Sequence, residues 1–136
     1  MKALSTRGVR NWVLTGGGSE AERAHCHDIA SRLGTQVTDI SGRTSMREYI
    51  HALSRARMVL CVDGSASHIA RAMSVPVVTL FGHVFPLRWH WPTPRHRAVS
   101  AFDCTQERPP STAHVSAEVF LQTCESLIAD EPGILS

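Results

Sequence analysis

The residues best placed for chemistry lie in one stretch, Asp63-Gly64-Ser65-Ala66-Ser67-His68. The four residues between the acid and the histidine carry little side chain, so a ligand can approach their backbone closely. If a helix starts here, its unpaired N–H groups favour an anion such as a phosphate. Small residues with a serine cap also open many helices that bind nothing. The stretch alone therefore leaves a phosphate site and a plain helix start both open.

An apolar run precedes this stretch, and a helical pattern follows it. Val59-Leu60-Cys61-Val62 is typical of a strand buried on both faces. Apolar residues then resume at helical spacing up to Met73. We therefore expect a strand, a tight turn and a helix, with Asp63 at the carboxyl end of the strand.

The same alternation recurs along the chain. It predicts strands over 12–15, 37–40, 59–62 and 77–81, and further helices over 19–33, 45–53 and 116–128. Capping-box spacing marks two helix starts, one at Ser19 with Glu22 and one at Ser45 with Glu48. Strands that alternate with helices pair in parallel through right-handed crossovers. This pattern predicts an α/β fold with a three-layer, Rossmann-like parallel sheet.

Small-residue turns follow each predicted strand, at 16–19, 42–45, 63–67 and 82–83. Parallel strands bring their carboxyl ends to one edge, where open α/β sheets bind ligands. Every α/β fold needs short turns, but four of them on one edge favour a ligand site there.

The remaining segments break the alternation. We expect a leader at 1–10, a Rossmann-like domain at 11–130 and a tail at 131–136. Residues 83–113 hold five of the seven prolines and are predicted to form a long irregular segment. Within it, Trp89-His90-Trp91 would stack on a base or sugar, or cover the sheet, and 95–97 would form a solvated basic turn.

Composition excludes several classes. Hydrophobic residues at 43%, charged residues at 19% and a net charge of +2 describe an ordinary globular domain without an electrostatic footprint for nucleic acid. The four cysteines form no Cys-x-x-Cys pair, so reduced thiols are expected. His25-Cys26-His27 would point in different directions on a helix, and no metal is expected. No apolar run approaches the ~20 residues of a membrane span, so we expect a cytoplasmic protein, at most peripheral at the inner membrane.

Four motifs, taken in order, resemble a known family. They are Val-Leu-Thr-Gly-Gly at 13–17, Ser-Gly-Arg-Thr-Ser-Met at 41–46, the stretch 63–70, and Pro-Val-Val-Thr-Leu-Phe-Gly at 76–82. From about residue 10 to about 125 the chain resembles the C-terminal half of the heptosyltransferases, glycosyltransferase family 9. That resemblance implies the donor-binding half of a GT-B enzyme of lipopolysaccharide core biosynthesis, with an ADP-heptose-like nucleotide sugar as donor substrate.

The resemblance also implies site residues. Glu20 matches a contact to the donor ribose, Thr44 and Ser45 match the turn beside the base, and the turn after Asp63 matches the one that faces the diphosphate. Asp63 itself matches the acidic residue of the donor motif, and we expect it both to bind a donor hydroxyl and to cap the following helix. The implied donor-binding residues are Gly17, Glu20, Thr44, Ser45, Asp63, Gly64, Ser65, Ala66, Ser67 and His68. The chain departs from the family pattern in the order Gly64-Ser65 and in the bulky residues at 83–85.

The family's N-terminal domain supplies the acceptor site and the catalytic base, and no residue here is assigned as that base. An inverting transfer also needs positive groups on the departing diphosphate. Arg43, His68, His83 and Arg88 are candidates for that task. Whether the chain is an enzyme is left open, since it is expected to bind rather than to catalyse alone. The alternatives are an interaction module that pairs through the exposed cleft face with another copy or a separate N-terminal chain, and a flavodoxin-like domain, whose acidic or flavin-stacking residues are not evident.

Overall fold

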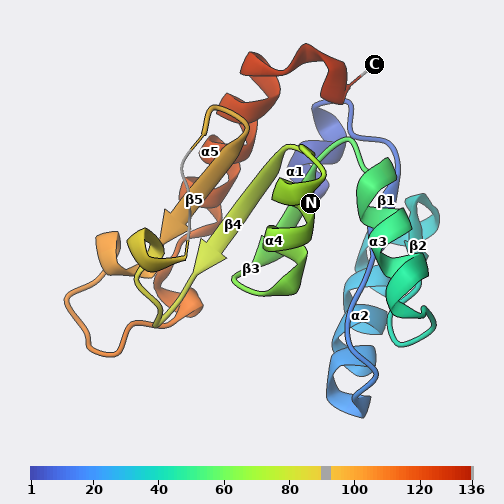
Figure 1. Ribbon diagram of the computed structural model, residues 1–136, viewed down its shortest axis with the longest axis horizontal. Helices are drawn as coiled ribbons and strands as arrows, with labels where there is room; N and C mark the ends of the chain where they lie inside the picture. The colour runs from blue at the N-terminus through green and yellow to red at the C-terminus, as the bar shows by residue number, and fades with distance from the viewer. Residues whose placement is uncertain (90–92, 136) are drawn as a thin grey trace. The chain divides into compact units, whose positions relative to one another are not determined.

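A computed structural model describes residues 1–89 and 93–135 (Figure 1). The chain divides into two compact units, Met1–Ala52 and Leu53–Ser136. We describe each unit by itself. No helix within the described part of the chain is both long and apolar enough to cross a membrane.

The first unit contains a two-stranded parallel sheet and its helices. Its elements are α1 (Lys2–Thr6), β1 (Trp12–Leu14), α2 (Glu20–Leu33), η1 (Gly34–Gln36), β2 (Val37–Asp39) and the greater part of α3 (Met46–Arg55). The register pairs Trp12 with Val37 and Leu14 with Asp39. Parallel pairing places the turns after β1 and β2 at the same edge of this sheet.

Both predicted helix caps form in this unit, and at Ser45 the reciprocal bond of a capping box, from the Ser45 N–H to Glu48, is present as well. The Ser19 hydroxyl accepts a hydrogen bond from the Glu22 N–H, and the Ser45 hydroxyl accepts one from the Glu48 N–H. Gly34 ends α2 with a positive φ of 73°, which is why a glycine stands there. These three features confirm the predicted bounds of α2 and the start of α3.

The second unit contains a three-stranded sheet. Its elements are β3 (Val59–Val62), α4 (Ser65–Ala72), β4 (Val77–Phe81), η2 (Pro86–Arg88), β5 (His96–Ser100), η3 (Ala101–Asp103), η4 (Thr112–His114), α5 (Ala117–Asp130) and η5 (Pro132–Ile134). The strand order is β3-β4-β5, and both pairings are parallel. The turns after β3 and β4 therefore lie at one edge, on neighbouring strands.

The central strand β4 forms the core of this unit. Val77, Val78 and Thr79 are fully buried, and Phe81 is only 1% exposed. The buried residues Cys124 and Leu127 belong to α5, which runs alongside β5 (Figure 1). A strand buried on both faces needs apolar residues at successive positions, as the run Val77 to Phe81 has except at Thr79, whose hydroxyl lies 3.9 Å from Cys61 Sγ.

Several expectations need correction. The α/β class with parallel strands is confirmed, but hydrogen bonding joins the strands into two sheets, so the four predicted turns form two pairs. The segment 83–113, expected to be irregular, contains η2, β5, η3 and η4. Part of the expected leader is helical, with Leu4 only 2% exposed, and the expected tail forms η5 with Ile134 buried.

The basic residues at 95–97 are also not a solvated turn. Arg97 forms an ion pair with Asp130, and Arg95 pairs with Glu131 at 3.1 Å. These ion pairs tie the start of β5 to the end of α5. Because each arginine is paired with a carboxylate more than 30 residues away in the sequence, its charge is compensated where β5 begins.

Candidate functional site

The residues implied as donor-binding fall into two groups, one in each unit. In the first unit, the turn after β1 and the turn after β2 are neighbours, because the Gly42 N–H donates to the Gly16 carbonyl at 3.1 Å. Gly42 has a φ of 64°, and a Cβ there would come within 3.3 Å of the Gly18 Cα. The contact between the two turns therefore depends on Gly42.

An acidic side chain already occupies the turn after β1. The Gly17 N–H donates to Glu22 Oε1 at 3.3 Å, and the Ser19 hydroxyl lies 2.5 Å from Glu22 Oε2. These hydrogen bonds lower the pKa of the Glu22 carboxyl. The Gly17 N–H is therefore already bonded within the chain. Glu20, the predicted ribose contact, is exposed on the first turn of α2.

The turn after β2 is organised in the same way. The Ser45 N–H and hydroxyl both bond Glu48 Oε2, at 2.8 and 2.7 Å, and thereby lower the pKa of the Glu48 carboxyl. Ser45 thus acts as part of a helix cap, whereas Thr44 is half-buried beside it. Of the two residues predicted to lie beside the base, Ser45 therefore uses its hydroxyl in the helix cap, whereas the Thr44 hydroxyl takes no part in this cap.

The start of α4 in the second unit is different. Gly64 is the N-cap residue, in extended backbone, and no side chain caps the helix. The prediction that Asp63 also caps this helix is therefore wrong, because Gly64, one residue later, holds the cap position. The half-buried Asp63 side chain bonds no other described residue, so its carboxylate stays available to a ligand.

The other residues of this stretch divide by exposure. Ser65 and His68 are exposed, Ala66 is half-buried, and Ser67 is 3% exposed. The Ser67 hydroxyl donates to the Gly64 carbonyl at 2.8 Å, so it faces the turn itself. The N–H groups of the first turn have no intrahelical partner, and the helix dipole adds partial positive charge there. This helix start can therefore bind an anion through backbone groups and the Ser65 hydroxyl.

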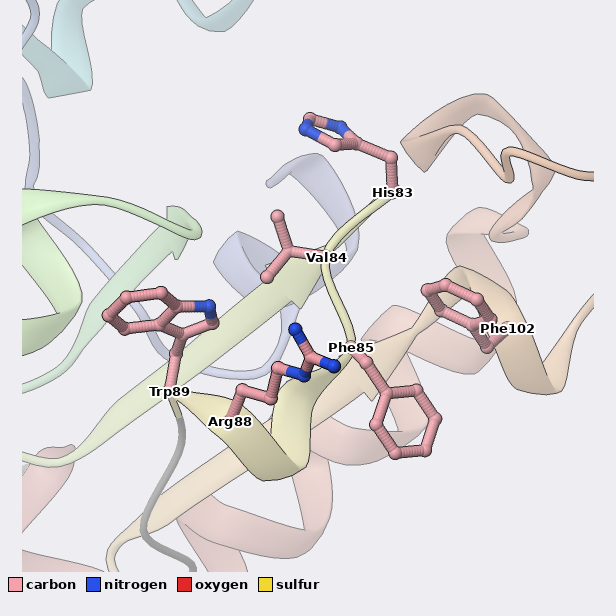
Figure 2. A pocket seen from close by; sticks show the side chains of 6 residues that line it. All are labelled: His83, Val84, Phe85, Arg88, Trp89 and Phe102. Atoms are coloured by element: carbon pink, nitrogen blue, oxygen red, sulfur yellow. The ribbon is translucent and has the colours of Figure 1, made fainter.

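A pocket of about 420 Å³ follows the neighbouring strand β4. Figure 2 shows its six lining residues, five from the segment after β4 and Phe102 from η3: His83, Val84, Phe85, Arg88, Trp89 and Phe102. The Phe85 and Phe102 rings meet edge to face with centroids 5.3 Å apart. The pocket thus opens at the carboxyl edge of the sheet, on the strand beside the one that leads into α4.

Two of the phosphate candidates from the sequence, His83 and Arg88, line this pocket, whereas the pocket itself was not predicted. In the sequence, the aromatic residues between 83 and 102 are the feature that could have indicated the pocket. Phe102 reaches the other lining residues only because β5 forms between them. Trp89 is exposed, and the predictions for His90 and Trp91 lie outside the described residues.

No metal set accompanies these groups. Within residues 1–89 and 93–135, no three His, Cys, Asp or Glu side chains gather as metal ligands would. In the sequence His25-Cys26-His27, Cys26 is buried in α2 while both histidines are exposed, so the three side chains diverge.

Comparison with known proteins decides the family. The family described as "Glycosyltransferase family 9 (heptosyltransferase)" matches residues 1–115, which is most of the chain. The chain belongs to this family. It is 36% identical over 91 residues to lipopolysaccharide heptosyltransferase 3 of Escherichia coli K12, a match that covers 64% of this chain and 26% of that protein. It is 27% identical over 103 residues to lipopolysaccharide core heptosyltransferase OpsX of Haemophilus influenzae, covering 62% and 30% of the two chains.

Two solved structures share the fold. The E. coli ADP-heptose lipopolysaccharide heptosyltransferase II superposes with a TM-score of 0.76 at 18% identity, over 96% of this chain and 40% of that one. A family 9 glycosyltransferase from Veillonella parvula superposes with a TM-score of 0.75 at 16% identity, over 88% and 37%. These matches confirm the expected GT-B-like α/β fold. The chain spans well under half the length of these relatives, which is consistent with a single half, the expected C-terminal one.

Proposed function

We propose that this heptosyltransferase-family domain binds an ADP-heptose-like nucleotide sugar, as the donor half of a glycosyltransferase of lipopolysaccharide core biosynthesis. The uncapped start of α4 is the observation that carries the proposal. The choice of donor comes from the relatives, which include a lipopolysaccharide heptosyltransferase and an ADP-heptose enzyme.

The helix starts of this chain differ in one respect that bears on anion binding. Ser19 caps α2, Ser45 and Glu48 cap α3, and Ser116 caps α5, so side chains satisfy those N–H groups. At α4 the cap residue is Gly64, and no side chain accepts a hydrogen bond from the N–H groups of the first turn. A diphosphate oxygen would supply the missing acceptors and the negative charge that a helix start favours.

The flanking side chains fit the rest of a donor. The Asp63 carboxylate, unpaired within the described chain, can accept hydrogen bonds from sugar or ribose hydroxyls. His68 is exposed in the first turn of α4, where it can donate to a phosphate oxygen. In the first unit, the contacts of Thr44 to a base and of Glu20 to a ribose stay predictions from the resemblance, and Gly17 and Ser45 hold the turns that carry these two residues.

Transfer itself requires more than this chain's assigned residues provide. A base must deprotonate the acceptor hydroxyl, and positive groups must stabilise the departing diphosphate. His68, beside the start of α4, is proposed for the second task, and no described residue is proposed for the first. We therefore propose donor binding by this half, with transfer completed by the half that brings the base. A cytoplasmic location remains a prediction.

Thermal unfolding with added nucleotide tests this function. A ligand that binds the folded state alone stabilises it by about 2.7 kcal/mol at a concentration one hundred times its Kd. ADP and ADP-heptose should raise the melting temperature in a concentration-dependent way, and UDP should do so less. Equal shifts with UDP would contradict adenine-nucleotide selectivity, and Asp63→Asn should reduce the shift with ADP-heptose.

A second function is favoured by one observation. Phe85, Leu87 and Trp89 are 46%, 77% and 58% exposed on the segment after β4. Exposed apolar side chains in one segment are a feature of interaction surfaces. The chain would then pair with a second copy or a separate N-terminal chain. Sedimentation velocity over a range of concentrations decides this: a dimer that Leu87→Ser dissociates supports the interaction module, and a monomer throughout excludes self-association.

A further inference from the structure

The pocket after β4 combines an apolar wall with positive charge. Its wall is made by Phe85, Trp89 and Phe102, and its charged or ionisable groups are His83 and Arg88. None of the six lining residues is acidic. A pocket of this composition attracts anions and repels cations, while it offers flat apolar faces.

The aromatic wall is held in place by contacts of its own. The Phe85 and Phe102 rings pack edge to face at an interplanar angle of 89°, and the Arg108 guanidinium covers Phe102 at 5.0 Å from the ring centroid. Arg108 is held in turn by the Thr105 carbonyl at 2.9 Å. A wall fixed by such contacts loses little freedom when a ligand binds, which favours binding.

The segment that carries Trp89 is also anchored. The Arg71 side chain of α4 donates to the Trp89 carbonyl at 3.2 Å. At the other end of the segment, Gly82 packs closely on Thr112: a Cβ at position 82 would lie only 3.3 Å from Thr112. The two anchors hold residues 83–89 between α4 and the segment at Thr112.

Arg88 differs from the arginines around it. Arg71, Arg95, Arg97 and Arg108 each bond a carbonyl or a carboxylate of the chain. The Arg88 and His83 side chains bond no other described residue. An unpaired guanidinium at an aromatic pocket is available to bind a phosphate or carboxylate in bidentate fashion.

We propose that this pocket binds a saccharide ring that carries a phosphate or carboxylate group. The C–H face of the sugar packs on the exposed Trp89 ring, its hydroxyls face the solvent at the open side, and its anionic group meets Arg88, whose side chain lies next to Trp89 (Figure 2). The choice of a saccharide rests on the proposed sugar-transfer function. A nucleobase fits less well, because the lining has no side-chain amide or hydroxyl to pair with the edge of a base once Arg88 holds the anionic group.

The test is a titration of the full ¹⁵N-labelled chain followed by NMR. The probes are glucose 6-phosphate, uncharged glucose and AMP, and the readout is the Trp89 indole N–H signal, identified by its loss in Trp89→Phe. Glucose 6-phosphate should shift this signal saturably, with glucose and AMP at least tenfold weaker. An unmoved indole signal at millimolar glucose 6-phosphate, or an equal response to AMP, would overturn the proposal.

Two variants test the anionic contact. Arg88→Gln should weaken glucose 6-phosphate binding about tenfold and leave glucose binding unchanged, because a hydrogen bond between charged groups is lost. Arg55→Gln, an exposed arginine at the end of α3, is the matched control and should bind like the wild type. Equal affinity of Arg88→Gln and the wild type for glucose 6-phosphate would contradict the assigned contact.

Adding ADP separates the two sources of such a sugar. If saturating ADP displaces glucose 6-phosphate, the pocket holds the sugar and phosphate of the donor, and if both bind together, it holds the acceptor. ADP binding without sugar-phosphate binding would overturn this inference alone. Sugar-phosphate binding without ADP binding would instead contradict the proposed donor function.

Discussion

The Ser67 hydroxyl donates a 2.8 Å hydrogen bond to the carbonyl of Gly64, the residue that begins α4. This bond turns the buried Ser67 side chain back onto the turn. Of the two serines in the stretch after β3, Ser65 is therefore the exposed one, whose hydroxyl is free to meet the proposed ligand. The helix start is held together by one serine and is open to a phosphate beside the other.

Replacement of Ser65 by glutamate should separate binding from folding. An acidic residue in the first turn of a helix is mildly stabilising, so the fold should persist. The same charge repels a diphosphate, so we expect Ser65→Glu to bind ADP at least about tenfold more weakly by calorimetry. Ser65→Ala, the matched control, should bind within a few-fold of the wild type. Unchanged ADP affinity in Ser65→Glu would remove the helix start from the site.

Gly42→Ala should destabilise the first unit. The φ of 64° at Gly42 is costly for a residue with a Cβ, and that Cβ would lie 3.0 Å from Arg23 Cδ. We expect a loss of about 1–2 kcal/mol in the free energy of unfolding, measured with urea. Gly18→Ala is the control, since its Cβ would meet nothing within 4 Å. Equal stability of the two variants would show that the turn can adopt another conformation.

Acid should weaken the turn after β2 through Asp39. Its Oδ1 accepts from the Ser41 hydroxyl at 2.6 Å and the Ser41 N–H at 2.9 Å, which lowers the pKa of Asp39 below its ordinary value of 3.8. A lowered folded-state pKa gives stability that is present above the unfolded pKa and lost as the pH falls through the folded one. In Asp39→Asn, the unfolding free energy should therefore fall less steeply below about pH 4.

Urea unfolding at several pH values between neutral and strongly acidic would measure this difference. Glu22 and Glu48, whose pKa values are also lowered, remain in the variant and keep part of the acid sensitivity. A wild-type pH dependence in Asp39→Asn would mean that the bonds to Ser41 do not differ between the folded and unfolded states.

The cysteines should react with thiol reagents at very different rates. Burial raises the pKa of Cys61 and of Cys124 to about 11, so little thiolate forms near neutral pH. Cys26 is buried, and Cys104 is exposed. An absorbance assay with a disulfide reagent in native buffer should show one fast equivalent, which Cys104→Ser abolishes. A second fast equivalent would show that another site opens readily.

Local sequence patterns predicted much of this fold. The strand of 77–81 and the helix start at Ser19 depend on neighbours in the sequence, through apolar runs and the spacing of a hydroxyl and a carboxylate. The structure has both where they were predicted. The strand, turn and helix over 59–72 were also predicted in this way, because the apolar run, the small residues and the helical pattern are contiguous.

Features that depend on distant partners were not predicted. Strand β5 begins with His96 and Arg97, a poor strand signal, and the ion pair of Arg97 with Asp130 makes that start acceptable. The pocket likewise needs Phe102 to meet Phe85, which β5 achieves between them. Asp63 was expected to cap α4 because acids often do, but the one-residue offset to Gly64 leaves its carboxylate unpaired within the described chain.

Calorimetric titration of the purified chain with ADP and ADP-heptose, with UDP as control, tests the central claim most directly. Donor binding at the open start of α4 predicts saturable binding of both adenine ligands, weaker binding of UDP, and loss of affinity in Ser65→Glu. No heat of binding for ADP or ADP-heptose at millimolar concentration would contradict a donor site on this chain.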